Sequence, residues 1–274
     1  MRMDYHIHTA HSPDCAVPME QQLRRAAELG ITELCLTDHL ELGLAMWNNA
    51  ETDLAAYREE YERLRDSFPG LRVKFGVEAG ISCDEAHFPR LKETMKSMDF
   101  DFVIASVHTL QGKNVLRDFS FEGDGLAQVC RDYIPSITRR LKALDPDSYS
   151  CVGHIDFPWK GALRLQIPRA AYSYAYAPDA MDELFRFLVE QGKCLEINTS
   201  PWALAPAEEL IKPDWLSRYA QLGGEFITIG SDSHRLENTG AFFREAVELA
   251  LASGVKYLAV YEKMQPRFIP LAKL

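Results

Sequence analysis

Long apolar segments are missing from this 274-residue sequence. No run approaches the roughly 20 residues of a membrane-spanning helix, and the first residues include no apolar signal-peptide segment. Gly/Ser-rich linkers and low-complexity stretches are absent as well, and the length suits one α/β barrel. We therefore expect one domain over residues 1–274, in the cytoplasm and without a membrane partner.

Paired cysteines are also missing. The six cysteines are scattered, and no two of them stand in a C-x-x-C pattern. This spacing argues against a zinc knuckle and against a disulfide framework. We expect buried, reduced thiols.

Positive charge is in deficit, because 30 lysines and arginines stand against 40 aspartates and glutamates, for a formal net charge of -10. No basic stripe is visible, so long nucleic acids are not expected as partners. We predict a small substrate instead. If that substrate is an anion, the site needs local positive charge, which bound metal ions can supply. These features do not predict the oligomeric state.

Strand-like and helix-like segments alternate through the chain. Strands are expected over residues 3–7, 31–37, 71–77, 100–107, 150–153, 193–198 and 225–229, and helices over residues 18–30, 53–68, 87–98, 123–144, 178–192, 215–222 and 240–253. Such alternation is typical of a parallel sheet, and about seven strands in one domain suit a closed or nearly closed barrel. Residues 157–177 are aromatic rather than Gly/Ser-rich and are expected to form an ordered insertion or lid, and residues 257–260 a strand-like tail.

Histidines and acids gather where the expected strands end. His6 and His8 share one face of the first strand, because side chains alternate with period two. Residues just past the strands of a parallel barrel converge at one end. This reasoning selects His6, His8, Asp14, His39, Glu78, His108, His154, Asp232 and His234. Imidazole suits transition metals and carboxylates bridge ions, and nine donors are too many for one tetrahedral ion. We predict two or three divalent ions.

The ordered motifs resemble those of the polymerase and histidinol phosphatase (PHP) family. They are His6-Ile7-His8-Thr9, Asp14, Thr37-Asp38-His39, Gly76-Val77-Glu78, Ala105-Ser106-Val107-His108, Gly153-His154-Ile155-Asp156, Glu196-Ile197-Asn198-Thr199 and Gly230-Ser231-Asp232-Ser233-His234. The resemblance implies a distorted (β/α)7 TIM-like barrel with a trinuclear metal centre. It assigns one ion to His6, His8, Glu78 and Asp232, a second to Glu78, His108 and His154, and a third to Asp14, His39 and His234.

The resemblance also implies a metal-dependent phosphomonoesterase, with L-histidinol phosphate as the expected substrate. Water activated by the ions would attack phosphorus in line, and the catalytic residues are expected to be His234, Asp232 and Glu78. His234 or another pocket residue would protonate the leaving alkoxide. Many family members carry histidine where Asp14 stands, so zinc, iron and manganese all stay open as the metal. His11 is either a replacement ligand or a pocket-lining or solvated residue.

Residues around the ligands are candidates for substrate binding and ligand orientation. Lys160, Arg164, Arg117 and Asn198 are expected to bind substrate, with solvated or turn-forming roles as the alternative. Asp38 and Asp156 either orient ligand histidines or act as capping or solvated carboxylates. The aromatic residues Trp159, Tyr172, Tyr174 and Tyr176 either wall the pocket or pack the insertion onto the barrel.

Two other functions compete with this hypothesis. One is a PHP enzyme of another specificity, acting on a nucleotide, sugar phosphate, phosphotyrosine or oligonucleotide. The other is a degenerate barrel that only binds a ligand, against which the complete donor set argues, since binding alone would not need nine metal-compatible residues.

Overall fold

Seven parallel strands lie side by side in the described part of the chain, in the order β1, β2, β4, β5, β8, β9 and β10. The structure is a computed structural model that describes residues 1–42, 52–81, 85–167, 172–204 and 214–274. The strands are β1 (Met3–Ile7), β2 (Glu33–Leu36), β4 (Arg72–Gly80), β5 (Phe102–Ser106), β8 (Cys151–Val152), β9 (Cys194–Asn198) and β10 (Phe226–Gly230). Nearly all of their residues are buried, as expected for parallel strands covered by helices.

The last strand of this series meets the first, so that the strands form a ring. The Asp232 N–H donates to the His6 carbonyl at 2.7 Å, and the His8 N–H donates to the Ser233 carbonyl at 3.1 Å. The first half of β10 pairs instead with β11 (Tyr257–Glu262), which continues into antiparallel β12 (Gln265–Pro270). Because β10 divides its pairing between β1 and β11, the barrel is distorted, and the predicted (β/α)7 TIM-like fold is confirmed.

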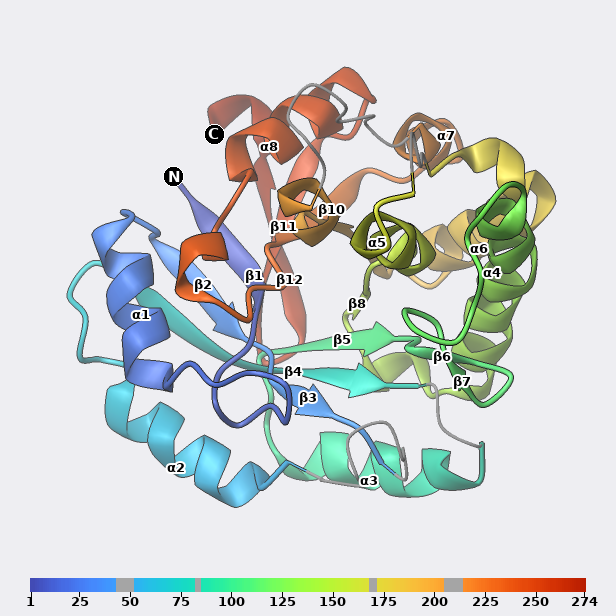
Figure 1. Ribbon diagram of the computed structural model, residues 1–274. Coiled ribbons are helices and arrows are strands. Elements are labelled where there is room, and N and C mark those ends of the chain that lie inside the picture. The colour runs from blue at the N-terminus through green and yellow to red at the C-terminus, as the bar shows by residue number, and fades with distance from the viewer. Residues whose placement is uncertain (43–51, 82–84, 168–171, 205–213) are drawn as a thin grey trace.

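Helices surround the strands on the outside (Figure 1). They are α1 (Met19–Glu28), α2 (Leu54–Leu64), α3 (Phe88–Ser97), α4 (Gly125–Ala143), α6 (Pro178–Glu190), α7 (Trp215–Gln221) and α8 (Phe243–Ala252). Their boundaries follow local signals. The Asp53 carboxylate accepts the N–H groups of Ala55 and Ala56 and so caps α2, while α1 is followed by Gly30 in the left-handed region at φ 69°.

Several short elements were not expected from the sequence. Strand β3 (His39–Leu40) pairs with β4, and β6 (Thr109–Leu110) and β7 (Lys113–Asn114) form a hairpin after β5. The expected tail over 257–260 is part of the β11–β12 hairpin. Within the expected insertion 157–177, residues Phe157–Arg164 form helix α5, which lies inside the outer ring of helices in Figure 1. A 3-10 turn follows at Tyr174–Tyr176, and residues 168–171 lie outside the described residues.

The cysteines agree with the sequence analysis. The five that the structure describes are free and buried, which confirms the expected reduced thiols for these positions. Cys83 lies outside the described residues. Among the described helices, none combines the length and the apolar character that crossing a membrane requires.

Candidate metal centre

The nine residues selected from the sequence converge at the carboxyl ends of the barrel strands. Register places some of them directly, since β3 and β4 pair with His39 opposite Glu78. Three triplets of donors lie with their ligand atoms within 4.8 Å of one another: His6, His8 and Asp232; His8, His39 and His234; and His39, Glu78 and His108. Of these seven residues, all but His234 are buried.

The first group gathers on β1 and the exit of β10. His6 Nε2 lies 3.1 Å from His8 Nε2 and 3.4 Å from Glu78 Oε2. His8 Nε2 lies 3.3 Å from Asp232 Oδ1. Four donors from distant parts of the sequence therefore face one point.

The second group uses the other oxygen of Glu78. Oε1 lies 2.7 Å from His154 Nε2 and 3.2 Å from His108 Nε2. These two ring nitrogens are 3.3 Å apart. Glu78 thus stands between the first and second groups with one carboxylate oxygen toward each, which is the arrangement of a bridging ligand.

The third group lies nearer the surface. Asp14 Oδ1 is 3.5 Å from His39 Nε2, and Asp14 Oδ2 is 3.3 Å from His234 Nε2. His234 Nδ1 lies 3.0 Å from the Asp232 carbonyl oxygen. Because a carbonyl only accepts, Nδ1 carries the hydrogen, and Nε2 is the ring nitrogen left available to a metal ion between His234 and Asp14. This geometry favours His234 as a ligand over His234 as the proton donor.

The electrostatics of these groups suit cations. Burial alone would raise the pKa of Glu78, but His6, His39 and His108 hold that pKa well below its usual range. Burial likewise opposes ionisation of Asp232, whose pKa Lys160 and His6 nevertheless keep well below its usual range. The Oε2 atom of Glu78 is buried among ring nitrogens, with His39 Nδ1 at 2.9 Å and His6 Nε2 at 3.4 Å. Buried ionised carboxylates and clustered ring nitrogens fit divalent metal ions.

Asp232 occupies a strained position where the barrel closes. Its φ is 49°, in the left-handed region that non-glycine residues enter at a cost of about 1–3 kcal/mol. Its N–H bonds to His6, while its side chain turns back with Oδ1 toward His8. The strained residue therefore has two roles: its backbone closes the barrel, and its side chain belongs to the donor cluster.

Two buried glutamates that the sequence analysis did not select support the histidines from behind. Glu196 Oε1 lies 2.6 Å from His6 Nδ1, and Glu41 Oε1 lies 2.5 Å from His108 Nδ1. The sequence held a signal for each of them. Glu196 is an acid within an apolar strand, and Glu41 stands two residues after a ligand histidine.

The two aspartates expected to orient histidines behave differently. Asp38 accepts the Ser12 hydroxyl at 2.6 Å, and Ser12 Oγ lies 3.1 Å from His8 Nδ1, so Asp38 acts on His8 through Ser12. Asp156, in contrast, makes no side-chain hydrogen bond to a histidine within the described residues. It precedes α5, and burial raises its pKa to about 7. For Asp156 the structure does not support the orienting role.

Asn198 and His11 bond to residues outside the set of nine donors. Asn198 Oδ1 accepts the Ser200 N–H at 2.9 Å and the Ser200 hydroxyl at 2.7 Å, as in the turn alternative, and Asn198 Nδ2 donates to Glu196 Oε2 at 3.4 Å. Its role in substrate binding stays a prediction. His11 Nε2 lies 2.7 Å from Glu60 Oε2, so the structure does not support His11 as a replacement ligand.

A small cavity opens onto the donor cluster. Its volume is about 60 Å³, room for roughly four water-sized groups. Its cationic lining residues are Lys160, Arg164 and Arg117. Lys160 is buried and pairs with Asp232 Oδ2, whereas the two exposed arginines have no ion-pair partner among the described residues. The cavity thus offers free positive charge beside the donors.

The aromatic residues of the expected insertion do not line this cavity in the described part of the chain, except Phe157. Tyr172 is buried and donates to the Ile155 carbonyl at 2.7 Å, and Tyr174 donates to Asp182 at 2.8 Å. Trp159 is buried, and Tyr176 packs against the core. The packing alternative therefore describes all four residues.

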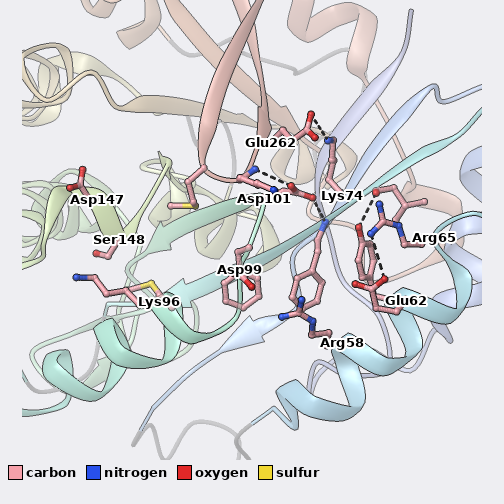
Figure 2. A pocket seen from close by; sticks show the side chains of 17 residues that line it. Arg58, Glu62, Arg65, Lys74, Lys96, Asp99, Asp101, Asp147, Ser148 and Glu262 are labelled. Carbon is pink, nitrogen blue, oxygen red and sulfur yellow. Dashed lines mark hydrogen bonds and ion pairs between the residues drawn. The ribbon is translucent and has the colours of Figure 1, made fainter.

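A larger cleft of about 530 Å³ lies at the opposite end of the barrel, where β4, β5 and β8 begin (Figure 2). Four of its charged residues form two ion pairs: Lys74 lies 3.6 Å from Glu262, and Arg65 lies 3.5 Å from Glu62. No histidine lines it. Since active sites of α/β barrels lie at the carboxyl ends of the strands, the donor cluster and not this cleft is the candidate site.

A seven-stranded α/β barrel with histidine and carboxylate donors at its mouth defines a class of metal-binding barrel proteins. A model of the PHP domain matches residues 4–200. The chain belongs to the PHP-domain family.

Named relatives agree with this assignment, and a solved structure shares the fold. The chain is 28% identical over 270 residues to a protein named histidinol-phosphatase from Lactococcus lactis subsp. lactis, and the match covers 96% of each chain. It is 28% identical over 260 residues to "Probable histidinol-phosphatase" of Clostridium acetobutylicum, covering 91% of this chain and 93% of the relative. A crystal structure of histidinol phosphate phosphatase from Lactococcus lactis, complexed with zinc, L-histidinol and phosphate, matches with a TM-score of 0.80 and 24% identity, covering 97% of this chain and 98% of that one.

Proposed function

We propose that this chain is a metal-dependent phosphomonoesterase of histidine biosynthesis that hydrolyses L-histidinol phosphate to L-histidinol and phosphate. The observation that carries the proposal is the convergence of nine donors at one end of the barrel, with Glu78 between two groups and Asp14 between His39 and His234. The name and bound ligands of the Lactococcus relatives support the choice of substrate. We further propose that the protein acts in the cytoplasm.

The three groups would hold two or three divalent ions, with zinc favoured by the zinc in the related structure and iron or manganese as alternatives. His6, His8, Glu78 and Asp232 form one set; His108, His154 and Glu78 the second; Asp14, His39 and His234 the third. Bound ions would supply Lewis acidity to the phosphoryl group and to the attacking water.

The remaining residues of the cavity would bind the anionic substrate. Arg117 and Arg164 carry unpaired positive charge at the mouth, and Lys160 lies deeper, beside Asp232. These cations would hold the phosphate so that water attacks phosphorus in line with the ester oxygen. The new P–O bond forms as the ester bond breaks, and the leaving alkoxide takes up a proton to become the alcohol.

A panel of phosphate esters tests the substrate. The zinc-loaded protein is assayed for kcat/KM with L-histidinol phosphate, a nucleoside monophosphate, a sugar phosphate, phosphotyrosine and a short oligonucleotide. We expect L-histidinol phosphate to exceed the others by about 10²-fold. Equal or better turnover of another ester would remove L-histidinol phosphate as the substrate.

A pair of lysine variants tests the anion contacts. Lys160→Met should raise KM, because it removes the buried positive charge of the cavity. Lys142→Met is the matched control, since Lys142 pairs with Glu183 on the surface at 2.6 Å. Equal KM values for the two variants would exclude Lys160 from substrate binding.

A further inference from the structure

Glu196 connects two of the donor groups from behind. Its Oε1 accepts from His6 Nδ1 at 2.6 Å, and its Oε2 accepts the backbone N–H of His154 at 2.7 Å. The residue is buried between two glycines: a Cβ at Gly230 would lie 2.7 Å from Oε1, and one at Gly153 would lie 3.6 Å from Oε2. The carboxylate thus fits closely between β1, β8 and β10.

Glu41 supports the second donor group in the same way. Its side chain is 2% exposed, and its Oε1 accepts from His108 Nδ1 at 2.5 Å. The position of Glu41 depends on Gly80, because a Cβ there would lie 1.7 Å from Glu41 Oε2. Space at Gly80 is therefore needed for Glu41 to reach His108.

These contacts determine which ring nitrogen carries the hydrogen. An ionised carboxylate only accepts, so Nδ1 of His6 and Nδ1 of His108 must donate. In a neutral ring the lone pair then lies on Nε2. In both histidines Nε2 is the atom that faces Glu78, at 3.4 Å for His6 and 3.2 Å for His108.

We propose that Glu41 and Glu196 are positioning residues that fix the Nδ1–H tautomer and the ring orientation of His108 and His6, and so set how long the metal ions stay bound. The inference rests on the metal centre of the proposed function. It extends that centre to two residues that neither bind substrate nor act as ligands themselves. Carboxylates behind metal-binding histidines raise metal affinity by about 10–100-fold.

Isosteric Glu→Gln variants of the full-length, zinc-loaded protein test the proposal. The measurement is the rate at which each variant releases zinc to an excess of chelator. A glutamine at 196 has one acceptor oxygen where Glu196 has two, so its NH₂ must face either His6 or the His154 N–H. Glu196→Gln should therefore lose zinc about 10–100-fold faster than wild type. Glu41→Gln keeps an acceptor for His108 and should stay closer to wild type, whereas Glu41→Met, which has none, should lose zinc faster.

Glu33→Gln is the matched control. Glu33 is a buried glutamate of the same barrel that accepts the Tyr5 hydroxyl at 2.5 Å and pairs with Arg72, away from the donors. It should lower thermal stability and leave zinc release unchanged. Wild-type zinc release in Glu196→Gln would overturn the proposal, and so would equal acceleration in Glu33→Gln. If Glu41→Met does not fold, the zinc-release rates of the three glutamine variants still test the proposal.

Nitrogen-15 NMR of the histidine rings provides a readout that does not depend on catalysis. In the zinc-loaded wild type, His6 and His108 should show hydrogen-bearing Nδ1 signals, identified by their loss in His6→Gln and His108→Gln. Hydrogen on Nε2 of either ring would refute the tautomer assignment. A protein that passes both tests but fails to hydrolyse L-histidinol phosphate would refute the proposed function alone.

Discussion

Gly230→Ala is the substitution for which the structure makes the sharpest prediction. Gly230 ends β10, and a Cβ there would lie 2.2 Å from His6 Cβ and 2.7 Å from Glu196 Oε1. Relief of these overlaps needs a displacement of about 1 Å in a close-packed interior. Overpacking of this kind costs about 1–3 kcal/mol of unfolding free energy.

The same displacement moves His6 and the carboxylate that orients it. A misplacement of about 1 Å lowers kcat/KM by about 10²-fold. We therefore expect Gly230→Ala to be folded but nearly inactive on L-histidinol phosphate, with less bound zinc per chain. The measurements are kcat/KM, zinc content by mass spectrometry and the unfolding free energy.

Gly224→Ala separates this effect from a general loss of stability. Gly224 precedes the same strand at its other end, and a Cβ there would lie 2.3 Å from the Tyr219 ring. Both variants should be destabilised, yet only Gly230→Ala should lose activity and zinc. Wild-type kcat/KM and zinc content in Gly230→Ala would refute the claim that the closure of the barrel positions the metal centre.

The remaining predictions concern ligands, metal and pH. His108→Ala and Glu78→Ala should each lose most of kcat while circular dichroism shows a folded protein; near-normal turnover by both would remove them from the centre. Stripping the metal should lower the melting temperature, since one ion at 100 times its Kd stabilises the folded state by about 2.7 kcal/mol; an unchanged melting temperature would contradict a bound ion. In the metal-free protein, hydrogen bonds from Arg218 lower the pKa of Asp182 from 3.8 to about 2. Wild type should therefore exceed Asp182→Asn by about 1 kcal/mol at neutral pH, and this difference should shrink as pH falls below 3.8 toward 2; a difference that stays constant over this range would contradict the pairing.

The ring of strands and its donors were predictable because they depend on local features. Strand and helix alternation places the carboxyl ends of parallel strands at one edge, so residues that follow strands, such as Glu78 and His154, meet regardless of their separation in sequence. The resemblance of the ordered motifs to a known family added the division into three groups. The structure brings the nine residues to one end of the barrel, and their division among individual ions stays a prediction.

The supporting residues were less predictable, because their contacts are between distant strands. Asp156 stands two residues from His154 but precedes α5, while the acid that reaches the His154 backbone is Glu196, from β9. Proximity in sequence does not tell where a side chain points after a strand ends. Helix α5 was likewise hidden, since aromatic residues in 157–177 resembled a loop insertion.

Anomalous diffraction at the zinc edge from crystals of the zinc-loaded protein would test the central claim most directly. We predict two or three peaks at the carboxyl ends of the strands, each about 2.0–2.2 Å from nitrogen or oxygen donors of the nine residues. One peak should lie beside Oε1 of Glu78 and another beside Oε2. Peaks only elsewhere on the molecule, with phosphatase activity that survives removal of zinc, would contradict the account.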